Sequence, residues 1–163
     1  MDLPVTLLDD DSQLTTFENL RGGRAMVLDF WHTKCVKCPA ALDRLNESAA
    51  GGGLVNGESV VFVACALSQG EGNRALACEM MSGHYENLTH VFMEIDAKEK
   101  AKEVFGFSAV PFVVVVRSDG TVLGQGDPKT INYVELLKSH GEHHVPTASQ
   151  PTASHSLVFD EDF

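Results

Sequence analysis

Two cysteines in this sequence, Cys35 and Cys38, are separated only by Val36 and Lys37. Thiols at this spacing can exchange with a disulfide, because one thiolate attacks and the other resolves the mixed disulfide. The same spacing could supply two zinc ligands, but a zinc site usually needs four organised ligands. The sequence has no second CxxC pair, and no His pair follows at the distance that zinc fingers use. We therefore expect redox chemistry, with two buried structural thiols near a turn as the alternative.

The residues around this pair favour a reactive first thiol. Unpaired backbone N–H groups and the helix dipole stabilise a thiolate at the start of a helix. We expect Cys35 at such a helix N-terminus, and Cys38 one turn further along, more buried, as the resolving thiol. Lys34 and Lys37 add positive charge nearby, and positive charge lowers the pKa of a thiol.

Apolar runs and helix-start signals predict the elements that position the pair. The segment 24–31 is apolar after its first residue except for Asp29, as expected for a central parallel strand, and Pro39 suits the first turn of the next helix. Similar patterns predict strands at 59–65, 90–95, 111–116 and 122–124, a turn at 118–121, and helices at 40–46, 71–82, 96–104 and 129–138, the last two capped by Asp96 and Asp127. This order predicts an α/β fold, with a central mixed β-sheet flanked by helices on both faces.

The segment Asp29–Cys38 resembles the active-site segment of the thioredoxin superfamily, in which a strand ending in Asp-Phe-Trp shortly precedes a CxxC pair. The segment Ala109–Phe112 is similar to that family's cis-proline loop. Residues 17–22 and the long stretch 65–90 are similar to the branch that contains tryparedoxins, nucleoredoxins and TlpA-like oxidoreductases. The similarity covers residues 17–137 and implies the thioredoxin fold.

Asp29 is predicted to lie inside the sheet. Burial removes hydration from a carboxylate, so we expect a raised pKa for this side chain. The resemblance implies that Asp29 accepts a proton, directly or through water, when Cys38 attacks. The alternative is that Asp29 caps the following loop through backbone contacts.

The resemblance also implies a substrate site. A cis Pro111 would place the Val110 backbone beside the cysteines, where it could hydrogen bond to an extended substrate, and we expect Lys34 and Lys37 to line the same site. The sequence departs from the family where Lys34 replaces an aromatic residue, where Val-Lys separates the cysteines, and where Phe112 replaces a common Thr. These departures leave the client proteins and the reduction potential open.

Composition narrows the classes of partner. The formal net charge of -11 disfavours nucleic acid, whose phosphates need clustered Lys and Arg, and it also disfavours anionic membranes. The acidic N-terminal residues lack the basic start and long apolar stretch of a secretory signal, so we expect a cytoplasmic protein. In that reducing compartment structural disulfides are uncommon, and Cys65 and Cys78 are interpreted as packing residues.

We expect two regions in the chain. Residues 1–138 form the predicted thioredoxin-like domain, and residues 139–163 form a flexible low-complexity tail with repeated Pro, Thr, Ala and Ser. The tail ends in the acidic and aromatic segment Phe159–Phe163, which could dock onto a protein partner.

Two functions follow. The first is a thiol-disulfide oxidoreductase that uses Cys35 and Cys38 to reduce disulfide-containing client proteins or small molecules. An external dithiol reductant or reductase would regenerate the pair. We expect no metal, and no cofactor other than this disulfide. The second is a thioredoxin-like adaptor, weak or inactive in redox chemistry, that binds partners through its surface and tail.

Overall fold

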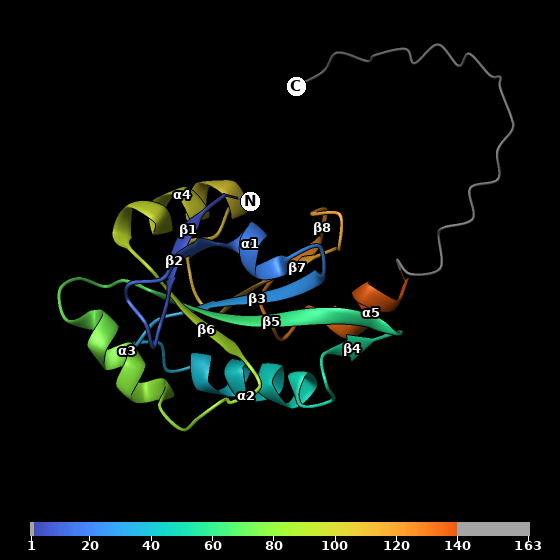
Figure 1. The fold of residues 1–163 in the computed structure, drawn as a ribbon, viewed down its shortest axis with the longest axis horizontal. Helices are drawn as coiled ribbons and strands as arrows, with labels where there is room; N and C mark the ends of the chain where they lie inside the picture. The colour runs from blue at the N-terminus through green and yellow to red at the C-terminus, as the bar shows by residue number, and fades with distance from the viewer. Residues whose placement is uncertain (1, 140–163) are drawn as a thin grey trace, which may run out of the picture.

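The computed structural model describes residues 2–139, built around a mixed β-sheet with helices on both faces (Figure 1). The strands are β1 (Pro4–Leu7), β2 (Leu14–Thr16), β3 (Ala25–Trp31), β4 (Leu54–Val55), β5 (Glu58–Leu67), β6 (Thr89–Met93), β7 (Phe112–Val116) and β8 (Val122–Gly126). The helices are α1 (Phe17–Arg21), α2 (Cys38–Ala49), α3 (Asn73–Met81), α4 (Ile95–Phe105) and α5 (Tyr133–Ser139). The predicted fold class is confirmed.

The sheet runs in the order β2-β1-β6-β5-β3-β7-β8, and β4 pairs with β5 beside this path. The neighbours β3, β5 and β6 are parallel, whereas β7 and β8 add antiparallel strands at one side. Every residue of β3 is buried, as the continuous apolar run predicts for a central strand covered on both faces. The sheet therefore holds the end of β3 in a fixed position, and the CxxC segment starts there.

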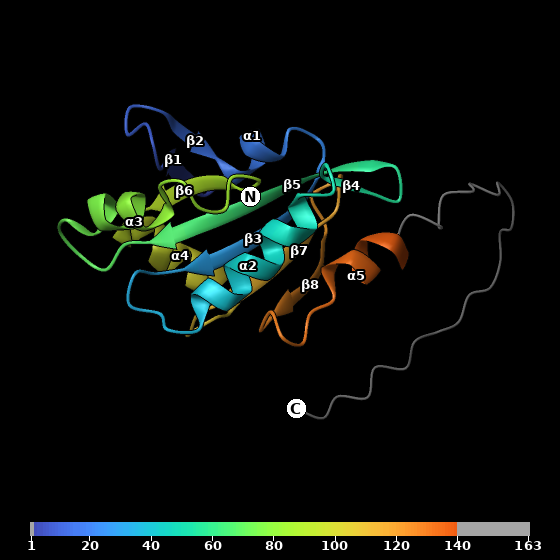
Figure 2. The ribbon, with the colours of Figure 1, turned by 90° about the horizontal axis from the view of Figure 1, so that it is seen from below.

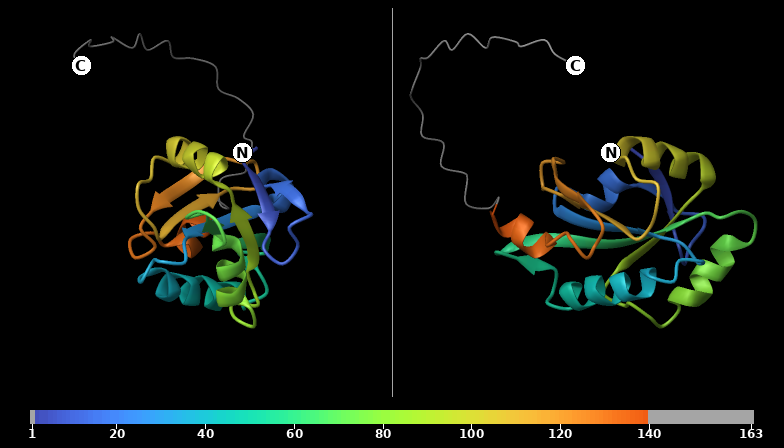
Figure 3. Two further views of the ribbon diagram at one scale, coloured as in Figure 1. Left: turned by 90° about the vertical axis from the view of Figure 1, so that its left-hand side faces the viewer. Right: turned by 180° about the vertical axis from the view of Figure 1, so that it is seen from behind.

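Side chains that alternate along the strands supply two separate cores. Helices α2, α3 and α5 pack on one face with the β3 residues Ala25, Val27 and Trp31. Helices α1 and α4 pack on the other face with Met26, Leu28 and Phe30. Figure 2 shows α2 lying along the first face, and Figure 3 shows α4 on the opposite side of the sheet.

Several predicted boundaries differ from the structure. Helix α4 is capped at Glu94 rather than at Asp96, which lies in its first turn. Helix α5 begins at Tyr133, because Asp127 instead accepts hydrogen bonds from the backbone N–H groups of Lys129 and Thr130 and so forms a separate turn. Helix α4 ends at Gly106, whose left-handed φ of 66° is one that glycine adopts most easily.

The strands β1, β2 and β4 were not predicted. They are between two and four residues long, which is too short for a clear alternation of apolar and polar residues. Helix α1 is equally short and begins at the Thr16 cap, whose side chain accepts a hydrogen bond from the Asn19 backbone N–H.

Within residues 2–139, no helix is both long and apolar enough to cross a bilayer. The predicted tail lies outside the described residues apart from Ser139, which belongs to α5. The expected partner-docking segment Phe159–Phe163 also lies outside them.

Candidate functional site

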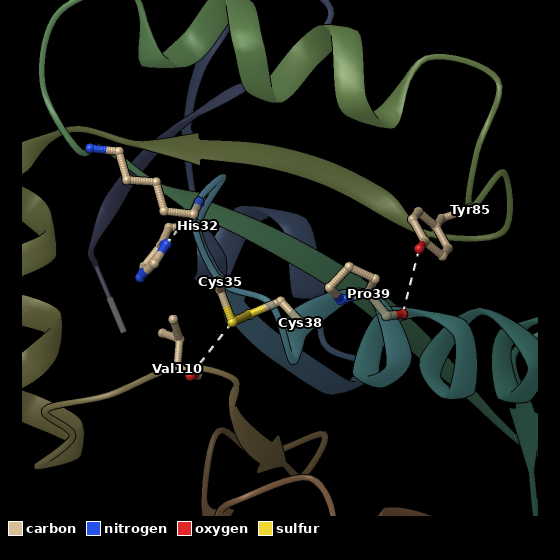
Figure 4. The surroundings of a disulfide bond; sticks show 7 residues. His32, Cys35, Cys38, Pro39, Tyr85 and Val110 are labelled. Carbon is tan, nitrogen blue, oxygen red and sulfur yellow. Dashed lines mark hydrogen bonds between the residues drawn. A yellow bond between two sulfur atoms is a disulfide. The ribbon is translucent and has the colours of Figure 1, made fainter.

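Cys35 and Cys38 form a disulfide in the segment that joins β3 to α2, with their Cα atoms 5.4 Å apart (Figure 4). Cys38 is the first residue of α2 and is buried, whereas Cys35 lies in the preceding turn and is partly exposed. We expected Cys35 at the helix N-terminus itself, but the helix begins three residues later, after its Lys37 cap. The accessible sulfur is therefore that of Cys35, and Cys38 lies behind it.

Local hydrogen bonds shape the turn that presents Cys35. The Cys35 backbone N–H donates to the His32 carbonyl at 3.1 Å, and the Cys38 N–H donates to the Cys35 carbonyl at 3.3 Å. The Lys34 backbone N–H donates to His32 Nδ1 at 3.2 Å. Pro39 then occupies the first turn of α2, where a missing N–H costs no helical hydrogen bond.

The segment between α4 and β7 approaches the disulfide from another part of the chain. The Val110 carbonyl oxygen lies 3.6 Å from Cys35 Sγ, close enough to accept a hydrogen bond from the reduced thiol (Figure 4). The peptide bond between Val110 and Pro111 is cis. The fold thus brings Val110 and Pro111 next to the cysteines, 75 residues away from Cys35 in sequence.

Asp29 lies in β3 with no exposed surface. Its neighbours on the adjoining strands are Ala64 of β5 and Val113 of β7, and the strand alternation puts it on the same sheet face as Trp31 and α2. Neither carboxylate oxygen has a hydrogen-bond partner among the described residues, so the loop-capping alternative has no contact to support it. Burial raises the pKa of Asp29 well above its ordinary value.

Lys34 and Lys37 lie on the rim of the site, and both are exposed. Lys37 faces Pro111 and Arg44 across a small cavity of about 50 Å³. Their ammonium groups can therefore act on a bound substrate or a thiolate only through solvent-screened charge.

The stretch between β5 and β6 adds contacts to the site that sequence reasoning missed. The buried Asn73 at the start of α3 donates from Nδ2 to Thr33 Oγ1 at 2.7 Å and accepts from the Gln69 backbone N–H at 3.2 Å. Tyr85 donates its hydroxyl to the Pro39 carbonyl at 3.5 Å (Figure 4). These hydrogen bonds connect the stretch between β5 and β6 to Thr33 before the cysteine pair and to Pro39 after it.

Two hollows flank the disulfide. One, of about 230 Å³, is largely apolar and is lined by both cysteines, Trp31, Met80 and Tyr85, among others. The second, of about 200 Å³, lies beyond His32 and Val110 and contains two Lys side chains of α4. His32 borders both hollows. Partial burial lowers the pKa of its imidazole, a backbone hydrogen bond opposes this to a smaller extent, and the charges of Lys98 and Lys34 lower the pKa slightly further.

The remaining cysteines are separate from this site. Cys65 is buried in β5 and belongs to the core on the α4 side, and burial raises the pKa of its thiol well above the ordinary value. Cys78 is half-buried on α3 and packs against the other core. In the part of the chain that the structure describes, no three His, Cys, Asp or Glu side chains gather in a geometry that could hold a metal ion.

No protein-family model matches the sequence, and no curated protein is similar enough to count as a match. Solved structures do match the fold. An exposed lipoprotein thioredoxin from Streptococcus pneumoniae aligns with a TM-score of 0.63 at 17% identity, over 86% of this chain and 97% of the other. A secreted disulfide oxidoreductase from Mycobacterium tuberculosis aligns with a TM-score of 0.59 at 23% identity, over 83% and 91%.

A thiol:disulfide interchange protein from a Bacteroides species aligns with a TM-score of 0.60 at 14% identity, over 87% of this chain and 91% of the other. At these identities the likeness concerns architecture. The chain has the thioredoxin fold, as the sequence resemblance implied.

Proposed function

We propose that this chain, which has the thioredoxin fold, is a thiol-disulfide oxidoreductase that reduces disulfide-containing clients through Cys35 and Cys38. The observation that supports this most directly is the arrangement of the pair. The partly exposed Cys35 sulfur is bonded to a buried Cys38 and lies 3.6 Å from the Val110 carbonyl oxygen. An accessible first sulfur with a resolving sulfur behind it is what stepwise disulfide exchange requires.

The reaction starts from the reduced protein. The Cys35 thiolate attacks one sulfur of the client disulfide, forming a mixed disulfide and releasing the first client thiolate. The Cys38 thiolate then attacks the Cys35 sulfur, which re-forms the Cys35–Cys38 disulfide and releases the second client thiolate. Two electrons pass from the protein to the client, and each released thiolate takes up one proton.

Asp29 is the proposed proton acceptor for the second attack. Cys38 is buried and must lose a proton before it can act as a nucleophile. A carboxylate in water is a weak base, but burial raises the pKa of Asp29 toward that of a thiol. A base whose pKa is closer to that of the proton donor transfers the proton more efficiently. Asp29 lies on the sheet face that α2 covers, and a direct or water-mediated transfer is part of the proposal.

The protein in its disulfide form needs an external dithiol to return it to the reduced form. One thiolate of the reductant would attack the partly exposed Cys35 sulfur, which breaks the Cys35–Cys38 bond and releases the Cys38 thiolate. The second thiolate of the reductant would then attack the mixed disulfide, so that the reductant leaves as its own disulfide and both protein cysteines are reduced. The proposed clients are proteins with accessible disulfides, and the cytosol, where such reductants are kept reduced, is the proposed compartment.

Reduction of insulin disulfides in the presence of a dithiol tests the proposal. Wild-type protein should accelerate precipitation of the insulin chains, and Cys35→Ser should remove that acceleration completely. Cys38→Ser should instead retain the mixed disulfide, which non-reducing electrophoresis and mass spectrometry detect. Cys78→Ser is the matched control, since this half-buried cysteine lies outside the site, and it should behave as wild type.

If wild type and Cys35→Ser are equally inert against insulin and against several smaller disulfides, the oxidoreductase proposal fails.

A further inference from the structure

The basic hollow beside Val110 has a composition unlike the rest of this acidic chain. Its charged or titratable lining residues are Lys98 and Lys102 of α4 and His32, and the rest of the lining consists of Leu67, Gln69 and the segment Phe107–Val110. Among residues 2–139, no carboxylate lines it, although the whole chain carries a formal charge of -11. Its border with Val110 puts it next to the reactive sulfur, because that carbonyl lies 3.6 Å from Cys35 Sγ.

Lys98 carries the charge that is least compensated in this hollow. Its side chain is only 13% exposed, and its ammonium donates to the neutral Ser68 carbonyl at 2.8 Å. The carboxylate of Glu99 is 4.0 Å from Lys98 and forms its shorter contact, 2.9 Å, with Lys102. A Lys side chain that is largely buried has less water around it than an exposed one. Its ammonium has three donors, and among the described residues one of them is used, by the Ser68 carbonyl.

The hollow on the other side of the disulfide has the opposite character. Trp31, Leu42 and Met81 form its floor, and the more exposed Met80 and Tyr85 form its edge. Figure 4 shows Tyr85 on the far side of the disulfide from His32 and Val110. An extended chain that crosses the Cys35 sulfur would therefore meet an apolar surface on one side and a cationic one on the other.

From this asymmetry we infer that the preferred client is a polypeptide whose attacked cysteine has an acidic residue on one side and an apolar residue on the other. The acidic side chain enters the hollow of Lys98, Lys102 and His32, and the apolar side chain packs in the hollow of Trp31 and Met80. The inference rests on the proposed oxidoreductase function and names its substrate class. Complementary charge gives selectivity among clients, and salt weakens it.

Short disulfide-linked homodimeric peptides provide the test. Each peptide has one cysteine between a Leu and a variable residue, which is Glu, Gln or Lys, and both orders are made. The rate constant for reduction by the pre-reduced full-length protein is measured in low salt and in 1 M NaCl. In one of the two orders the Glu peptide should react about fivefold faster than its isosteric Gln counterpart, the Lys peptide should be slowest, and 1 M NaCl should remove most of the difference.

Charge-removing variants locate the effect. Lys98→Gln and Lys102→Gln should each reduce the preference for Glu over Gln to about twofold or less. Lys100→Gln removes the same charge from the exposed surface of the same helix and does not line the hollow, so it should keep the full preference.

The outcomes distinguish a wrong substrate class from a wrong oxidoreductase function. If Glu and Gln peptides react equally in both orders while all are reduced, the substrate-class inference is wrong and the oxidoreductase function stands. A preference that survives both Lys98→Gln and Lys102→Gln, or that Lys100→Gln also removes, overturns the assignment to this hollow. If the protein reduces none of the peptides, the proposed function fails and this inference fails with it.

Discussion

The two faces of the central sheet are built from different side chains. On the face covered by α1 and α4, Phe30 of β3 lies among the rings of Phe17, Phe105 and Phe107 at centroid distances of 6.1, 5.7 and 4.9 Å. On the face covered by α2, the same strand contributes Asp29 and Trp31, whose buried polar atoms have no hydrogen-bond partner among the described residues. We call the first the aromatic face because its rings cluster around Phe30. The α2 face also has buried rings, those of Trp31, Phe62, Phe92 and Tyr133, but it differs in placing unpaired polar groups beside the disulfide.

Two buried cysteines show what this difference means for reactivity. Cys38 and Cys65 have almost no exposed surface. Cys65 lies inside the aromatic side of the sheet, where burial and, to a smaller extent, the charge of Asp29 raise the pKa of its thiol. Cys38 lies at the start of a helix and is bonded to the accessible Cys35. A buried thiol can therefore enter exchange only through a partner that reaches the surface.

The two faces of the sheet also affect the stability of the fold in different ways. An ionised carboxylate that is buried without a partner costs several kcal/mol in principle. Aromatic packing on the opposite face of the same strand offers a compensating contribution, because each fully buried aromatic ring stabilises the fold by burial and by ring-ring contacts.

Removal of one ring from each face should give the largest effect. Phe30→Ala should lower the free energy of unfolding by about 4–5 kcal/mol, because it empties a fully buried site with three aromatic neighbours. Phe62→Ala, on the other face, is the matched variant and should cost about 1 kcal/mol less, since Phe62 has a single aromatic contact, Tyr133, at 6.4 Å. Urea unfolding of the oxidised proteins measures both values.

Equal losses for the two variants, or a larger loss for Phe62→Ala, would contradict the expectation that the ring contacts of Phe30 stabilise the fold more than those of Phe62. If Phe30→Ala does not fold, Phe30→Leu compared with Phe62→Leu gives the same ranking with smaller losses.

The parts of the fold that sequence predicted are those with a strong local pattern. The strands β3, β5 and β7 are apolar runs that the sheet buries on both faces, so hydrophobicity alone located them. The edge strand β2 and its neighbour β1 are short and half-exposed. Their positions depend on the pairing of β1 with β6 and with β2. The local pattern of apolar and polar residues does not indicate this long-range pairing.

The same distinction applies to the candidate site. The CxxC spacing, Asp29 within an apolar run, and Val110 before Pro111 are motifs that can be read from neighbouring residues. The Asn73–Thr33 hydrogen bond joins residues 40 positions apart, and a buried Asn has no distinctive sequence context. The basic hollow was missed for the same reason, because Lys98 and Lys102 look like ordinary exposed residues of an amphipathic helix.

A smaller effect is expected when the polar group of the α2 face is altered. Asp29→Asn should slow the attack of Cys38 on the mixed disulfide about 10²-fold, because an amide cannot accept the thiol proton. The first attack by Cys35 should change less than threefold. Rapid acid quenching followed by mass spectrometry separates the two steps, since the mixed disulfide accumulates when only the second is slow.

Asp43→Asn is the control for that experiment, since Asp43 is an exposed carboxylate on α2, and it should leave both steps unchanged. If Asp29→Asn resolves the mixed disulfide at the wild-type rate, Asp29 is not the proton acceptor, and its burial needs another explanation.

Per pH unit, the smallest effect concerns the pH dependence of stability. The pKa of Asp29 is raised in the native protein and is near its ordinary value of 3.8 in the unfolded chain, so between these two pKa values the native state binds more protons than the unfolded state. Its contribution to stability is therefore fully present at acidic pH and is lost as the pH rises, by up to about 1.4 kcal/mol per pH unit until the native pKa is reached.

Asp29→Asn removes this loss, so the variant should gain stability relative to wild type as the pH increases from about 4, and the difference should level off above the native pKa. Urea unfolding of both oxidised proteins at unit pH intervals measures it, with Asp43→Asn expected to follow wild type. A difference between Asp29→Asn and wild type that stays constant with pH would mean that the buried carboxyl does not change its proton affinity on folding. In that case the α2 face would be no more sensitive to charge than the aromatic face behind it.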